Sequence, residues 1–269
     1  MAIITLFYIY TKFFTCSYFI KKFNFAPIIM LIFFIALLEL ITLPKLVPNY
    51  LLPPPHKVII YISNSFRLLI YHTLLTCLEA FLGFILAIVM GFLVSIVFAH
   101  SRFAERALLP YTIALKAVPI IAIAPLLVVW FGNGLLTQLV MSALICFFPI
   151  VVNVTIGLRS VSSSMIEFLR SISASRLQIF WYARIPVSLP YLFSGLKIAS
   201  TLSLVGAIVA ELSGADRGLG YLILTASYTL DTVKLFAAII SASLAGIIFF
   251  YSIYWIEKKL LFWHESTMA

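Results

Sequence analysis

Residues 73–99, which read TLLTCLEAFLGFILAIVMGFLVSIVFA, decide the fold class of this chain. Glu79 is the one charged residue in the stretch. A helix needs about 20 predominantly apolar residues to cross the hydrocarbon core of a bilayer, so this stretch is long enough to span a membrane. Similar runs recur along the chain, and their repetition predicts an all-α polytopic membrane protein.

The composition agrees with a chain that is mostly embedded in lipid. It is 64% hydrophobic and 10% charged, whereas a soluble domain is about half apolar and about a quarter charged. We therefore expect six transmembrane helices. Their expected ranges are 26–44, 73–99, 108–131, 135–158, 193–213 and 235–256.

The distribution of basic residues predicts the orientation. With the N-terminus inside, most of the 18 lysines and arginines fall on the cytoplasmic side, as the positive-inside rule requires. Both termini are then cytoplasmic. The net charge of +9 does not indicate nucleic-acid binding, because the basic residues lie between apolar runs and form no basic domain. We find no cluster of residues with metal-ligand spacing and predict no metal site.

The chain is expected to divide into three parts. These are a cytoplasmic or interfacial leader at 1–25, a transmembrane domain at 26–262 and a tail at 263–269. A cleaved signal or an extra span is the alternative for the leader. It carries lysines but no small-residue cleavage site before the next apolar run.

Prolines mark the third expected span. Pro119 and Pro125 interrupt it, and a proline inside a helix removes a backbone hydrogen bond. Such a span either lines a translocation path or has a packing kink. Gly132 to Gly134 predict a tight turn into the fourth span, and Asn153 in that span is a further polar candidate for the path.

The loop 159–192 carries two helix-start signals. Ser164 and Glu167 fit one capping box, and Ser175 and Gln178 fit a second. The first predicts an amphipathic helix at 165–172 and the second a helix at 176–185, with Pro186 and Pro190 ending the latter before span five. Such a loop is either a docking surface or a segment that packs on its own helices or on lipid headgroups.

A resemblance to a known family favours docking. The segment EFLRSISAS at 167–175, followed by Ile185-Pro186 and Leu189-Pro190-Tyr191, resembles the EAA loop of ABC importer permeases. The likeness extends over about residues 27–262, through Ala124-Pro125-Leu126 and through Gly218-Leu219-Gly220. It points to the branch for nitrate, sulfonate, taurine and pyrimidine precursors, and so to a type I ABC importer permease fold.

The resemblance implies residue roles and partners. Coupling to an ABC ATPase subunit would fall to Glu167, Arg170, Ser171, Ile172, Ser173, Ala174, Ser175, Ile185 and Pro186. Phe168 and Leu169 replace the family's small pair and Ser173 replaces its glycine, so the loop is bulkier than usual. The expected partners are that ATPase, an extracytoplasmic solute-binding protein and a second permease copy in a homodimer. The expected location is the bacterial inner membrane.

ATP would bind to the partner, because this chain has no G-x-x-x-x-G-K-[ST] motif and is expected to hold no cofactor. The segment 213–232 is either a lid or binding-protein contact, or a plain connection. Nitrate, sulfonate, bicarbonate and a pyrimidine precursor stay open as solutes.

Two other classes of function compete with the importer. A secondary transporter would relay protons through Glu39, Glu79 or Glu211, because carboxylates inside spans are functional candidates. Glu79, which can share a helix face with His72, is either on the path or an interhelical hydrogen-bonding group. A membrane enzyme is disfavoured, because no H-E-x-x-H or G-x-S-x-G motif occurs.

Overall fold

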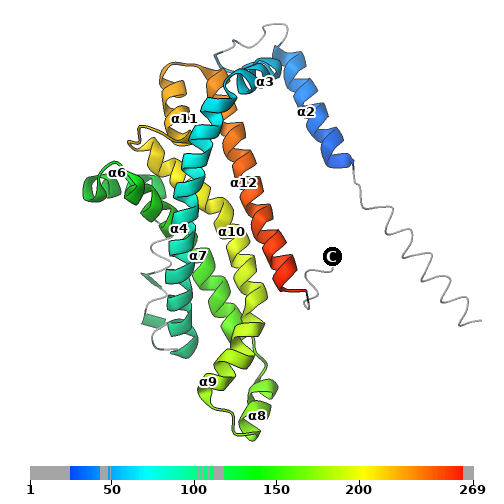
Figure 1. Ribbon diagram of the computed structural model, residues 1–269, viewed down its shortest axis with the longest axis vertical. Helices are drawn as coiled ribbons and strands as arrows, with labels where there is room; N and C mark the ends of the chain where they lie inside the picture. The colour runs from blue at the N-terminus through cyan, green and yellow to red at the C-terminus, as the bar shows by residue number, and fades with distance from the viewer. Residues whose placement is uncertain are drawn as a thin grey trace, which may run out of the picture. The chain divides into compact units, whose positions relative to one another are not determined.

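The structure is a computed structural model that describes residues 25–42, 48, 50–101, 103, 106–107, 110–111 and 118–262. Every regular element in these ranges is helical, which confirms the all-α prediction (Figure 1). The expected leader, apart from Phe25, and the expected tail lie outside the described residues. The chain forms two units, Met1–Ile59 and Ile60–Ala269.

The first unit holds the apolar helix α2, Ala26–Thr42, and the first half of α3, Pro55–Asn64. Glu39 lies near the C-terminal end of α2 and has a local partner. Its carboxylate lies 2.6 Å from His56 Nδ1 and accepts a hydrogen bond of 3.3 Å from the His56 backbone N–H. Glu39 is therefore paired within its own unit.

The second unit is built on α4 (Phe66–His100), α7 (Leu135–Arg159), α10 (Ile185–Leu212) and α12 (Thr232–Leu260). Each is long and apolar enough to cross a membrane. These helices confirm the second, fourth, fifth and sixth expected spans.

Two shorter helices complete the second unit's apolar part. In the third expected span, 108–131, residues 108–109 and 112–117 lie outside the described part of the chain, and helix α6 covers Ile120–Phe131. Pro119 caps α6 and only Pro125 lies inside it, so one of the two expected interruptions is a helix start. The expected turn at Gly132 to Gly134 is confirmed. The connection at 213–232 contains a further helix, α11 (Leu219–Tyr228).

Helix α4 buries several polar residues and exposes large apolar ones. Thr76 is fully buried and Glu79 is 7% exposed, whereas Leu74 is 64% exposed and Phe81 49% exposed. A soluble helix buries the opposite face. The exposed apolar face matches contact with lipid tails, and polar groups in a span face the bundle interior.

The core of the second unit is the meeting of α4, α7 and α10 around Ser142. The Ser142 hydroxyl donates to the Ser203 carbonyl at 3.0 Å. A Cβ added at Gly206 would lie 2.6 Å from Ser142 Cα, and one added at Gly83 would lie 2.5 Å from Ser142 Cβ. Small residues allow this close approach of helix backbones, which is how membrane helices gain packing energy.

The first loop helix begins earlier than the sequence predicts. Helix α8 spans Ser163–Ser171, and Ser162 is its N-cap, accepting from the Met165 backbone N–H. The capping box expected at Ser164 is therefore wrong, because the Ser164 hydroxyl donates to Ser162 instead. Three serines in succession offered alternative N-caps, and the S-x-x-E pattern selected the wrong one.

The C-terminal end of α8 is a Schellman motif with a serine in the glycine position. Ser173 has φ of 61°. The Ala174 N–H donates to the Leu169 carbonyl at 3.0 Å and the Ser173 N–H to the Arg170 carbonyl at 2.9 Å. These are the two hydrogen bonds that define the motif. The chain keeps the turn that a glycine would make and carries the steric cost of a Cβ there.

The second capping box is confirmed, but its helix does not stop at the prolines. Ser175 and Gln178 bond reciprocally and start α9, Arg176–Ile179. The helix continues through a π-turn, η1 (Phe180–Arg184), into α10. The prediction that Pro186 and Pro190 end it is wrong. We attribute this to η1, because a wider π-turn directly before Pro186 relieves the crowding that proline causes on the preceding turn.

The contact at Ser142 generates a test of the packing. Gly206→Ala should lower the free energy of unfolding by about 1–3 kcal/mol, because the added methyl forces α7 and α10 apart. Gly246→Ala on α12 is the matched control, since the nearest atom to its new Cβ lies 3.8 Å away. Thermal unfolding of both variants in detergent measures the difference. Equal midpoints would contradict the close contact.

The serine at the end of α8 generates a second test. Ser173→Gly should stabilise the α8 end by about 1 kcal/mol, because it removes a Cβ from a left-handed backbone. Amide hydrogen exchange in α8 should slow about fivefold. Ser171→Gly, at a right-handed helical position, should speed the same exchange. Faster exchange in Ser173→Gly would show that Ser173 is unstrained.

Candidate functional site

Two regions at opposite ends of the second unit carry the candidate functional residues. At one end α8 and α9 project beyond the long helices, and α11 lies at the other end (Figure 1). We call them the loop end, residues 159–184, and the α11 end, residues 213–231. The expected coupling residues lie at or beside the loop end, and Glu79 lies on the part of α4 that contacts the α11 end.

The loop end presents apolar side chains to its surroundings. Met165 is 48% exposed, Phe168 61% and Ile172 62%, and they lie on one face of α8 and its cap. Leu177 and Trp181 on the following helix are also exposed. An exposed group of large apolar side chains marks a surface that contacts a partner or a membrane.

The four arginines of the loop divide into two pairs. Arg159 donates to the Phe98 carbonyl, and Arg184 donates to the Ala99 carbonyl at 3.5 Å. Both cations therefore satisfy carbonyls in the last turn of α4, where a helix leaves carbonyls unpaired and favours positive charge. Arg170 and Arg176 are exposed. Only this second pair is available to a partner.

The structure brings most of the expected coupling residues together. Glu167 to Ser175 lie in α8 and the turn after it, and Ala174 is half-buried between exposed neighbours. Pro186 is exposed on the first turn of α10, but Ile185 packs against the buried core. Ile185 therefore belongs to the base of the projection.

The expected path residues do not form one site. Asn153 donates to the Pro149 carbonyl at 2.8 Å and packs beside Gly195, so its amide serves α7 and the contact with α10. Pro125 lies in α6. Of the expected path residues that the structure describes, Glu79 alone lines a cavity with polar walls at the α11 end.

The start of α11 is buried and is capped by side chains from other helices. Gly218 N–H donates to His72 Nδ1 at 2.9 Å, and Leu219 N–H donates to Thr76 Oγ1 at 2.8 Å. Gly220 N–H donates to Glu211 Oε2. Thr76 in turn donates to Glu211 Oε1 at 2.6 Å. These bonds satisfy three N–H groups that a helix start leaves unpaired.

The same cluster places two carboxyl groups side by side. Glu211 is fully buried and Glu79 is 7% exposed. The two carboxyl groups lie close enough to interact electrostatically. Glu79 Oε2 has no hydrogen-bond partner. This oxygen is the unsatisfied acceptor of an otherwise closed network.

A cavity of about 540 Å³ adjoins this network. Its walls come from α4, from the α6–α7 turn with the start of α7, and from the connection after α10. Glu79, Asn133, Gln138, Asp216 and Arg217 are its polar lining residues. Its volume lies in the range of small-molecule sites.

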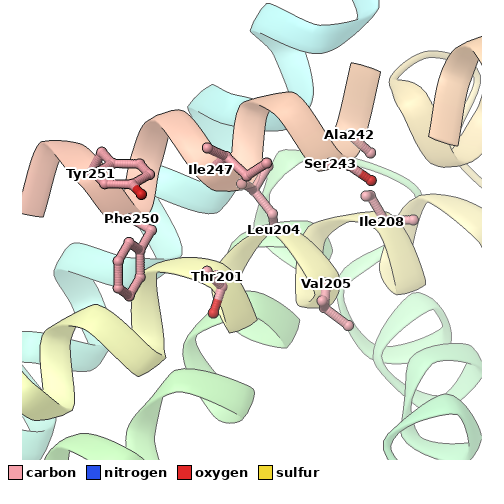
Figure 2. A pocket seen from close by; sticks show the side chains of 10 residues that line it. Thr201, Leu204, Val205, Ile208, Ala242, Ser243, Ile247, Phe250 and Tyr251 are labelled. Atoms are coloured by element: carbon pink, nitrogen blue, oxygen red, sulfur yellow. The ribbon is translucent and has the colours of Figure 1, made fainter. Parts of the chain in front are cut away.

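A second hollow, between α10 and α12, has different chemistry (Figure 2). Leu204, Ile208 and Ile247 dominate the view, and the Ser243 hydroxyl is already bonded to the Ile239 carbonyl. Such a groove suits lipid tails or another helix. It offers little to a polar solute.

Several contacts of these residues were not found from the sequence. Thr76 was not identified, and His72, Gly218 and Gly220 were identified without the hydrogen bonds that they make in the fold. Lys197, which is half-buried, and Glu257, which is buried, form an ion pair of 2.8 Å between α10 and α12, although the two residues are far apart in sequence. In the sequence, the carboxylate of Glu211 inside an apolar run indicated a functional candidate, but nothing indicated its partners.

Comparisons with known proteins identify the family of this chain. A family model described as "Binding-protein-dependent transport system inner membrane component" matches residues 83–262. A "Probable ABC transporter permease protein" of Haemophilus influenzae is 34% identical, over 80% of this chain and 87% of the relative. A "Formylaminopyrimidine transport permease protein" of Halalkalibacterium halodurans is 35% identical, over 81% and 87%. A "Riboflavin transport system permease protein" of Chloroflexus aurantiacus is 34% identical, over 81% and 82%.

The matched region contains α7, α10, α12 and the whole loop end. Four apolar helices of membrane-spanning length support the same assignment. The chain belongs to the binding-protein-dependent transport family of inner membrane components, the permease subunits of ABC importers for small solutes.

Proposed function

We propose that the loop end is cytoplasmic and docks on a separate ABC ATPase subunit through Glu167, Arg170 and residues 171–175. The observation that carries this is the exposed apolar face of α8, at the tip of a projection that the core of the bundle does not cover. Arg170 and Arg176 add positive charge at its rim, where complementary charges would steer association. Both chain termini are then cytoplasmic, as the positive-inside rule predicts.

A continuous helix would carry motion from the docking surface to the α11 end. Residues Arg176–Leu212 run without a break through α9, η1 and α10, a length of about 55 Å at 1.5 Å per residue. Glu211, near its far end, holds the start of α11. A displacement of the loop by the ATPase therefore moves the anchor of α11 directly, because packed helices shift as rigid bodies.

Two further partners complete the proposed assembly. A second permease copy forms a homodimer around a shared path, and an extracytoplasmic binding protein delivers the solute at the α11 end. ATP stays on the ATPase partner, since this chain has no phosphate-binding loop. The candidate solutes are nitrate, sulfonate, bicarbonate and a pyrimidine precursor.

Docking through the turn after α8 generates a direct test. Ala174→Glu should abolish copurification of the ATPase while membrane insertion persists, because a bulky charge at a half-buried contact cannot be accommodated without desolvation. Ser163→Glu is the matched control, since it adds the same charge at the exposed first turn of α8, where acids are favourable. Pull-down from solubilised membranes measures association. Retained association in Ala174→Glu would overturn the docking assignment.

A further inference from the structure

The cavity at the α11 end contains two buried acceptor groups that lack partners. Glu79 and Gln138 are 7% and 5% exposed, and both line this cavity. Glu79 Oε2 and Gln138 Oε1 have no hydrogen-bond partner. A buried polar atom without a partner costs about 1–3 kcal/mol. A structure that keeps two of them at one cavity is prepared for a ligand that supplies the missing donors.

The basic residue of the cavity lining, Arg217, has an acidic partner. The Arg217 side chain donates to Asp216 Oδ1 at 3.3 Å. The Asp216 carboxylate, and then the Tyr71 hydroxyl, raise the pKa of Arg217. The guanidinium therefore has an acidic partner next to it, and the charges of Arg217 and Asp216 offset each other in the cavity lining.

The acids of the cavity lining repel anions. Glu79 and Asp216 are lining residues, so any negative charge on them faces the cavity. The Asn133 amide lies beside Gly214 in the wall, where a Cβ would meet its Oδ1 at 2.8 Å. Nitrate or a sulfonate would bring only acceptors to the unpaired oxygens of Glu79 and Gln138, and would bring negative charge to the acids of the lining.

We propose that this cavity is an entry site that binds an uncharged small solute through its N–H or O–H donors, with Glu79 and Gln138 as acceptors. This rests on the proposed importer function and narrows its solutes to donor-bearing, uncharged molecules. The volume of about 540 Å³ accepts a single-ring heterocycle. Glu79 would also connect the bound solute to Glu211, and so to the helix that reaches the loop end.

A cysteine-protection experiment on the full-length protein in membranes tests this site. Ala215→Cys places a thiol in the cavity wall, and a membrane-impermeant maleimide labels it, with the unmodified chain as background. Cytosine, an uncharged probe with amino and ring N–H donors, should slow the labelling. Nitrate and ethanesulfonate, anions without such donors, should not.

Gln138→Met in the same background removes the acceptor and keeps the length of the side chain. It should raise the cytosine concentration needed for half-protection about tenfold, the loss expected for one hydrogen bond of about 1.4 kcal/mol. Thr155→Val is the matched control, because Thr155 Oγ1 is also buried and unpartnered but lies elsewhere on α7, outside this cavity. In Thr155→Val the cytosine concentration needed for half-protection should not change. Retained ATPase copurification checks that each variant is folded.

Protection by nitrate or ethanesulfonate alone, protection by none of the probes, or an unchanged half-protection in Gln138→Met would each overturn the proposal. Labelling needs no ATP hydrolysis. A failure here is therefore distinct from a failure of the ATPase to associate, which would instead overturn the proposed coupling.

Discussion

The buried start of α11 depends on hydrogen bonds to side chains of two other helices. Backbone N–H groups that face no water must find partners within the protein. Three consecutive N–H groups at residues 218–220 do so through His72 and Thr76 of α4 and through Glu211 of α10. Two long helices and the connecting segment are thereby tied together. A displacement of any one of them disturbs the caps of the others.

Gly218 shows that this arrangement leaves no room for a side chain at the start of α11. Its φ is 104°, a backbone conformation that favours glycine, and a Cβ there would lie 2.2 Å from the Glu211 carboxyl carbon. The glycine is required twice, for the turn and for the approach of the carboxyl group. The Ser173 turn at the other end has more freedom, because its Cβ strains only the backbone angle. The chain thus fixes the α11 end more tightly than the loop end.

The fold class and four spans followed from the sequence because apolar length is a local property that a bilayer enforces. The sequence predicted the helix starts within the loop less accurately. Ser175 with Gln178 identified its cap, whereas the run Ser162 to Ser164 offered competing caps that only the packed backbone resolves. Pro186 looked like a helix end, and the π-turn before it could not be read from residue types. Partners that meet across helices, such as Thr76 with Glu211, depend on the fold itself.

The central claim is that ATP hydrolysed by a partner drives uptake through this permease, and an ion gradient is the competing energy source. Solute uptake into right-side-out membrane vesicles that contain the complete transporter separates the two most directly. The account predicts that uptake persists when an uncoupler collapses the proton gradient and stops when ATP is depleted. Uptake that collapses with the gradient, and that proceeds without any co-expressed ATPase, would contradict it.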